Sequence, residues 1–80
     1  MSYFNYHAKA KNLIKDGHLV KFEIVEKWGN ISPALVLYFD NNRPMPIRSH
    51  RFDEYMELLK WLYNDIVFFV YLEKYTAIML

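Results

Sequence analysis

The hexapeptide ALVLYF, from Ala34 to Phe39, is the stretch of this sequence that decides the fold. It is apolar at successive positions instead of alternate ones, and residues that favour turns lie beyond both of its ends. A short, continuous apolar run of this kind is typical of a strand that is covered on both faces. We therefore expect Ala34 to Phe39 to form the central strand of a sheet, or a strand that lies at a subunit contact.

The segment before this strand predicts its first neighbour. Trp28-Gly29-Asn30-Ile31 contains a Gly-Asn pair, which is typical of a tight hairpin turn with a positive φ at its centre. Before that turn, apolar and charged side chains alternate, as they do in a strand with one face in water. We expect the apolar face of this strand to carry Val20, Phe22 and Ile24.

The segment after the central strand predicts a second turn and a shorter strand. Residues Asp40 to Arg43 (DNNR) tolerate the left-handed conformation and bond to their own backbone. Pro44 and Pro46 follow, and neither has an N–H to donate to a strand ladder. Pro44 to Arg48 is therefore expected as an edge strand or an extended segment.

Two helices are predicted outside these strands. Ser2 can cap the start of the first helix, and Gly17 can take the left-handed position that ends it. The second helix is expected to run to about Asn64, starting at Asp53 or, alternatively, earlier at Ser49. Apolar residues recur at helical spacing in both segments. They are Tyr3, Tyr6, Ala10, Leu13 and Ile14 in the first helix, and Phe52, Tyr55, Met56, Leu59, Leu62 and Tyr63 in the second.

The C-terminal fifteen residues, IVFFVYLEKYTAIML, include twelve apolar or aromatic side chains. Their β-branched and aromatic content favours a strand over Ile66 to Leu72, and a final short strand over Tyr75 to Leu80. One long strand or a buried helix fits the same pattern, because periodicity cannot separate these structures here. Together, the segments predict an α+β class: an antiparallel sheet of three to five strands with two helices on one face, in the order α-β-β-(β)-α-β.

Length and composition predict a single domain, residues 1–80, with more apolar surface than it can bury. The chain has only 80 residues, of which 54% are hydrophobic and 19% are aromatic. A chain of this size buries roughly 60 to 65% of the surface that its unfolded form exposes. We expect the C-terminal segment to pair with another copy or an unknown protein partner, which predicts a homodimer with an interaction or regulatory role. The expected interface residues are Phe68, Phe69, Tyr71 and Tyr75.

Charge and cysteine content exclude several classes of function. The formal net charge is +1, which does not favour a general nucleic-acid binder. The sequence has no Cys, so it has no disulfide framework, and a cytoplasmic location is expected. The longest apolar run of the C-terminal segment, Ile66 to Leu72, is far shorter than the roughly 20 residues of a membrane span. Neither a nucleotide loop nor clustered metal ligands are present, and we expect no cofactor and no metal.

The stretch RPMPIRSHR carries the largest local charge imbalance of the chain. It contains Arg43, Arg48, His50 and Arg51 and no acidic residue. Arginine suits phosphate and carboxylate groups, so these four residues are a candidate anion-binding or nucleic-acid-backbone site. The alternative is that acidic residues of the second helix neutralise them, namely Asp53, Glu54 and Glu57.

A small hydrolase that needs no metal is a further alternative for this stretch, with His50 as general acid or base and arginine stabilising the charge on phosphorus. It requires His50 to face a concave site that holds a second titratable group. The sequence identifies no such group, so we assign no catalytic residue and do not expect an enzyme.

The opening MSYFNYHAKAKNLI and the stretch PALVLYFDNNRPMPIRSHR together resemble a set of short uncharacterised proteins from Gram-positive bacteria. Some members of that set carry a haemolysin-type label. The resemblance covers most of the chain, but no motif in it has a mechanism that supports lysis. It implies no activity and no ligand, and no functional residue is carried over from it.

Overall fold

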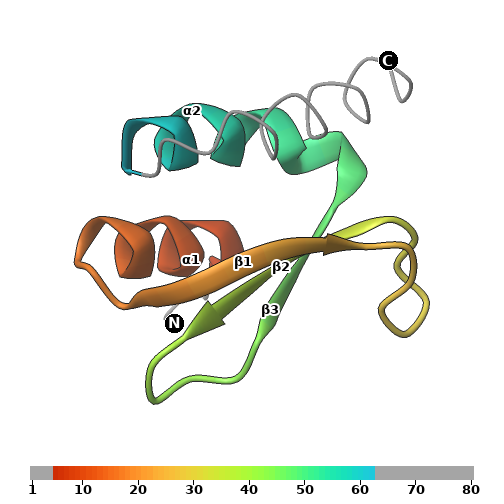
Figure 1. Ribbon diagram of the computed structural model, residues 1–80, viewed down its shortest axis with the longest axis horizontal. Coiled ribbons are helices and arrows are strands. Elements are labelled where there is room, and N and C mark those ends of the chain that lie inside the picture. The colour runs from red at the N-terminus through yellow and green to blue at the C-terminus, as the bar shows by residue number, and fades with distance from the viewer. Residues whose placement is uncertain (1–4, 63–80) are drawn as a thin grey trace.

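The computed structural model describes residues 5–62, which form a three-stranded antiparallel sheet with two α-helices (Figure 1). The strand order in the sheet is the sequence order, β1-β2-β3. This arrangement confirms the predicted α+β class. Along the chain, the elements are α1 (Tyr6–Lys15), β1 (Leu19–Val25), β2 (Ala34–Phe39), β3 (Met45–Arg48), a 3₁₀ turn η1 (Ser49–Arg51) and α2 (Phe52–Leu62).

The C-terminal predictions lie outside the described residues. They comprise the strands expected over Ile66 to Leu72 and Tyr75 to Leu80, together with four interface residues. Those four are Phe68, Phe69, Tyr71 and Tyr75.

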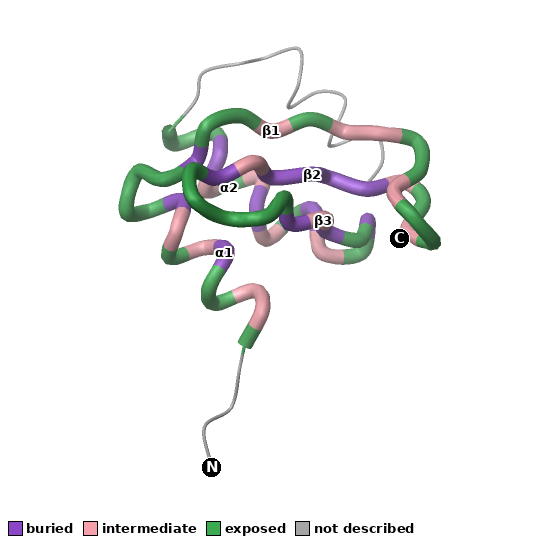
Figure 2. The backbone as a smooth tube through the Cα atoms, turned by 90° about the horizontal axis from the view of Figure 1, so that it is seen from below, coloured by how far each residue is buried: buried purple, intermediate pink, exposed green. Residues whose placement is uncertain are grey.

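Strand β2 is the central strand, as its sequence predicts. It pairs with β1 on one side and with β3 on the other, antiparallel in both cases. Figure 2 shows the buried colour along almost all of β2, whereas most of β1 is exposed or intermediate. Leu35 and Leu37 are fully buried on the face that joins the core cluster, and Val36 is fully buried on the opposite face. Burial on both faces of β2 explains why apolar residues occupy successive positions along it.

The inward face of β1 differs from the prediction at its first residues. Leu19 pairs with Phe39 and Lys21 pairs with Tyr38, so Val20 is an extra residue in the ladder. Such a β-bulge shifts the alternation of side chains by one position. Leu19 is therefore buried, and Val20 is 65% exposed instead of facing the core. Beyond the bulge the predicted alternation holds, with Phe22 and Ile24 packed against the core.

The two predicted turns are both present. The backbones of Trp28 and Ile31 donate to each other at 2.8 and 2.9 Å, which closes a tight turn. Gly29 lies at its first central position with φ of +62°, in the left-handed region that glycine adopts at no steric cost. This turn is the tip of a longer connection between β1 and β2. In the next connection Asn41 takes a φ of +54°, as the DNNR sequence predicts.

Helix α1 begins later than predicted and ends where predicted. Asn5, not Ser2, caps its start, because the Asn5 Oδ1 accepts from the Ala8 amide at 3.0 Å. At the other end the amide of Gly17 donates to the Ile14 carbonyl at 3.1 Å, and the amide of His18 donates to the Leu13 carbonyl at 3.0 Å. These two bonds form a Schellman motif, with Gly17 at a φ of +84°.

The second helical segment begins at Ser49, the earlier of the two predicted starts. Ser49 to Arg51 form the 3₁₀ turn η1, and α2 follows directly from Phe52. The expected start at Asp53 is therefore wrong, and the alternative start at Ser49 is confirmed. Asp53 lies instead in the first turn of α2, where its negative charge favours the positive end of the helix dipole.

The core forms between the helices and one face of the sheet. Ala10 and Ile14 of α1 belong to the same buried cluster as Phe52, Tyr55 and Leu59 of α2. From the sheet, this cluster takes Leu19, Leu35, Leu37, Phe39, Met45 and Ile47. The two helices are also joined directly, because the Lys11 Nζ donates to the Glu54 Oε1 at 2.8 Å.

Within residues 5–62, strand β3 lies at the edge of the sheet, as Pro44 and Pro46 predict. The Pro46 carbonyl accepts from the Tyr6 hydroxyl of α1 at 3.1 Å, so it faces away from β2. A residue of an antiparallel strand directs its N–H and its C=O to the same side, and Pro46 has no N–H to expose at that edge. The start of α1 is thereby fixed beside β3, next to the segment that carries the candidate site.

Candidate anion-binding site

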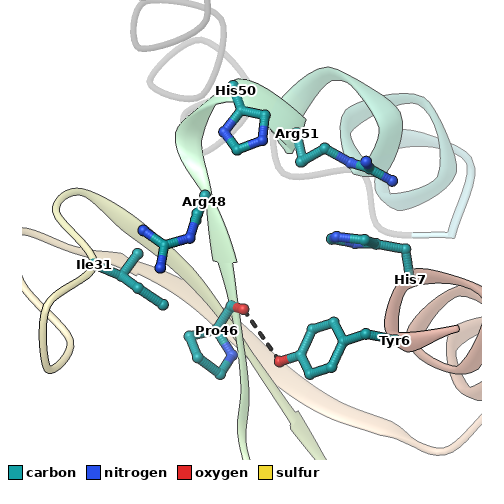
Figure 3. A pocket seen from close by; sticks show the side chains of 7 residues that line it. All are labelled: Tyr6, His7, Ile31, Pro46, Arg48, His50 and Arg51. Carbon is teal, nitrogen blue, oxygen red and sulfur yellow. Dashed lines mark hydrogen bonds between the residues drawn. The ribbon is translucent and has the colours of Figure 1, made fainter. Parts of the chain in front are cut away.

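A pocket of about 360 Å³ lies where the start of α1 meets the end of β3 and the turn η1. Figure 3 shows Arg48 and Ile31 on one side of it and His7 and Tyr6 on the other. His50 lies between these two sides. The complete lining is Tyr6, His7, Ile31, Pro46, Arg48, His50 and Arg51.

The local backbone explains why three neighbouring basic residues share this pocket. Arg48 ends β3 in an extended conformation, with φ of −72° and ψ of 152°. The chain then turns into η1, in which Ser49 is buried while His50 stays exposed. The tight turn places His50 and Arg51 next to the end of the strand instead of continuing away from it.

Arg48 and His50 are available to a ligand. Both side chains are exposed, and neither forms a hydrogen bond or an ion pair with any other part of residues 5–62. None of the residues that line the pocket carries a carboxylate. The pocket is therefore lined by hydrogen-bond donors whose charge no acidic side chain within it neutralises.

Arg51, in contrast, already has a partner. Its Nη2 donates to the Glu54 Oε1 at 3.1 Å, and its buried Nε lies beside the Oε2 without hydrogen-bonding geometry. The same Glu54 accepts from Lys11, and this hydrogen bond lowers the pKa of the Glu54 carboxyl. The alternative interpretation of the basic stretch, neutralisation by the second helix, is thus correct for Arg51. It does not extend to Arg48 within the described residues.

His7 enters the pocket from α1, and Tyr55 of α2 holds it in place. The His7 Nδ1 lies 2.7 Å from the Tyr55 hydroxyl, and the Tyr55 side chain is fully buried. Burial raises the pKa of Tyr55 well above its ordinary value, so this hydroxyl keeps its proton and can donate a hydrogen bond to the Nδ1 or accept one from it. Burial, followed by the nearby Arg51 guanidinium, lowers the pKa of His7. In the tautomer in which the Tyr55 hydroxyl donates to Nδ1, the neutral ring carries its hydrogen on Nε2.

Tyr6 forms a fixed wall of the pocket. Its hydroxyl donates to the Pro46 carbonyl, and its ring contacts the ring of His7 edge to face, with 5.5 Å between the centroids. Burial raises the pKa of the Tyr6 hydroxyl, which keeps the donor protonated. The wall is therefore held at two points, on β3 and on the neighbouring side chain.

The structure brings together three of the four predicted anion-binding residues. Arg48, His50 and Arg51 line one pocket, whereas Arg43 lies beyond the start of β3 and lines a different hollow. Sequence reasoning missed Tyr6 and His7. Their partners, Pro46 and Tyr55, lie 40 and 48 residues away along the chain, and no local pattern signals contacts of that range.

Comparisons with protein families, curated proteins and solved structures found no match to this chain. Within residues 5–62, no helix has the length and apolar character that a membrane crossing requires. Over the same range, no three His, Cys, Asp or Glu side chains gather as a metal site would need. The chemistry of the pocket itself therefore has to support any functional conclusion.

Proposed function

We propose that this protein binds a small phosphorylated molecule in the pocket between α1, β3 and η1. The observation that carries the proposal is the lining of this pocket. Donors from separate elements, Arg48, His50 and His7, face one concavity in which no carboxylate competes for them. A phosphate group has several acceptor oxygens and at least one negative charge, and arginine's planar guanidinium matches it with two parallel N–H donors.

The size and shape of the pocket agree with a small ligand. Its volume of about 360 Å³ is at the lower end of the range of roughly 300 to 1,000 Å³ that ligand pockets occupy. Arg48 and His7 lie on opposite sides of it (Figure 3), so a phosphate between them would receive donors from two directions. The apolar side chains Ile31 and Pro46 supply surface for the part of the ligand that carries the phosphate.

The contact of His7 with Tyr55 suits His7 to binding an anion. When the Tyr55 hydroxyl donates to Nδ1, Nε2 bears the hydrogen and can donate to an oxyanion. A nitrogen that already holds a proton cannot act as a general base. His50 does face a concave site with a second titratable group, His7, as the hydrolase alternative requires, but in the tautomer that donates to an anion His7 has no free nitrogen to act as a base.

Calorimetric titration of the full-length protein with inorganic phosphate and with phenyl phosphate tests this proposal. The variants Arg48→Ala and His50→Ala each remove one donor, and Lys27→Ala is the matched control because Lys27 is exposed and does not line the pocket. A hydrogen bond to a charged group contributes about 1.5 to 3 kcal/mol, which corresponds to a loss of affinity of roughly tenfold or more.

We expect that loss in both pocket variants and unchanged affinity in Lys27→Ala. Equal losses in all three variants would show that only the general charge of the protein attracts phosphate. Full binding by Arg48→Ala would contradict the proposed site directly.

A further inference from the structure

A second hollow, of about 630 Å³, adjoins the proposed phosphate pocket. It lies between α1, the connection from β2 to β3, and the first residues of β3. Its lining is Tyr6, Lys9, Asn41, Asn42, Arg43, Pro44, Met45 and Pro46. As in the first pocket, none of these residues carries a carboxylate.

The two pockets share one wall. Tyr6 and Pro46 line both of them, and the hydrogen bond from the Tyr6 hydroxyl to the Pro46 carbonyl joins these two residues. This bond is visible at the lower edge of the first pocket in Figure 3. The two pockets are therefore neighbours, with the Tyr6–Pro46 pair between them.

The second pocket has its own anion-binding chemistry. Arg43 is exposed and forms no hydrogen bond or ion pair with any side chain or backbone group of residues 5–62. The loop that carries it is ordered by the left-handed Asn41 and by the Asn42 Nδ2, which donates to the Asp40 carbonyl at 2.8 Å. A fixed loop that presents an available guanidinium costs a ligand less ordering entropy than a flexible loop would.

We propose that the ligand carries two phosphate groups on one small molecule, one held near Arg48 and the other near Arg43, with a spacer that passes over Tyr6 and Pro46. This inference rests on the proposed function of the first pocket and names the ligand class for it. Arg48 lies five positions after Arg43, so their Cα atoms are at most roughly 18 Å apart even in a fully extended chain. This upper bound is compatible with a spacer of moderate length, as in a sugar bisphosphate.

A small bisphosphate suits this chain better than a nucleic acid does. The formal net charge of +1 gives no general attraction to a long polyanion. The basic side chains that line the two pockets are confined to this region, on α1 and on the segment from Arg43 to Arg51. The recognition chemistry is therefore two separate anion sites instead of a continuous basic track.

The test compares a monophosphate with a series of linear alkyl bisphosphates that have short, intermediate and long spacers, and with a short single-stranded RNA. Binding to the full-length protein is measured by calorimetry for the wild type, Arg43→Ala, Arg48→Ala and the control Lys27→Ala. Arg43 is exposed and does not belong to the buried core cluster, so its removal should leave the fold intact. Circular dichroism of each variant verifies this.

We expect the intermediate bisphosphate to bind at least about tenfold more tightly than the monophosphate, because the second group binds at a high effective concentration. Arg43→Ala should abolish this gain and leave the affinity for the monophosphate unchanged, whereas Arg48→Ala should weaken both ligands.

Two other results would separate the proposals. If Arg43→Ala had no effect on any ligand while Arg48→Ala weakened all of them, the first site would stand and the two-phosphate ligand would be refuted. If Arg48→Ala also had no effect, both proposals would fail. Tighter binding of the RNA than of every bisphosphate would overturn the small-molecule class.

Discussion

Glu54 is the position where one substitution should move stability and ligand affinity in opposite directions. Its carboxylate accepts from Lys11 of α1 and pairs with Arg51 of η1, so it holds three elements together. Glu54→Gln keeps the size of the side chain and removes its charge. We expect this variant to be less stable than the wild type and to bind phosphate more tightly.

The loss of stability can be worked out from the exposure of the three side chains. Lys11, Glu54 and Arg51 are 30%, 32% and 35% exposed, so water screens their interactions in part. Fully exposed ion pairs contribute about 0.2 to 1 kcal/mol each, and glutamine keeps one oxygen as an acceptor. We therefore expect the free energy of unfolding to fall by about 1 kcal/mol, which lowers the Tm of a domain of this size by roughly 4 to 8 °C.

The gain in affinity has a separate physical origin. Glu54 does not line the phosphate pocket, but its partner Arg51 does. Removing the carboxylate leaves the Arg51 charge uncompensated and takes one negative charge away from the neighbourhood of the ligand. In a water-like dielectric, two unit charges separated by about 8 Å interact by about 0.5 kcal/mol, and we take this value as the scale of the effect. Phosphate affinity should therefore rise about two- to threefold.

The stability difference should also depend on pH. The hydrogen bond from Lys11 lowers the pKa of Glu54 in the folded state below its unfolded value. Such a group stabilises the fold above its unfolded pKa, and this contribution is lost as the pH falls through the folded pKa. The wild type should therefore approach the stability of Glu54→Gln in acid, where both side chains are neutral.

Thermal unfolding followed by circular dichroism measures the effect at pH 7 and at the lowest pH at which the wild type is folded. Glu57→Gln is the matched control, because Glu57 is exposed on the same helix and has no ion pair within residues 5–62. An unchanged Tm of Glu54→Gln at pH 7, or an equal loss in the Glu57→Gln control, would refute the stabilising role of the contacts that Glu54 makes with Lys11 and Arg51. A loss that persists undiminished in acid would show that the charge of Glu54 is not its cause.

Three further predictions concern stability, and thermal or urea unfolding tests each of them. Asn5→Ala removes the cap of α1 and should cost about 1 kcal/mol, whereas capping by Ser2 would predict no change. Gly17→Ala should cost about 1 kcal/mol, because φ is +84° there even though nothing lies within 4 Å of an added Cβ. Leu35→Ala should cost about 2 to 5 kcal/mol, while Val20→Ala, at a position that is 65% exposed, should stay within about 0.5 kcal/mol; similar losses would contradict the bulge in β1.

Local chemistry made several elements predictable. The continuous apolar run of β2 indicated a strand covered on both faces, and Pro46 indicated the edge position of β3. Gly17 and Asn41 take the positive φ values that their positions suggested. Each of these predictions depends on the conformational preferences of one residue or of a short segment. Such preferences follow from the residue types alone.

Tertiary packing decided which side chains at the start of β1 face the core and where α1 begins. The alternation in β1 suggested that Val20 faces inward, but a bulge against β2 places Leu19 there instead. A bulge depends on how two strands pair, and the sequence of one strand does not contain that information. In the same way, Ser2 and Asn5 are both suitable caps, and only the folded chain distinguishes them.

The candidate site shows the same division. The sequence by itself determined which neighbouring residues are basic, because Arg48, His50 and Arg51 have no acid among them, and it offered the pairing of Arg51 with Glu54, three residues away, as an alternative. Only the tertiary structure decided that Arg43 lines a separate pocket and that His7 joins the first one. The physical reason is range: backbone preferences act within a few residues, whereas the contact of His7 with its partner spans 48 positions and forms only when both helices pack into one core.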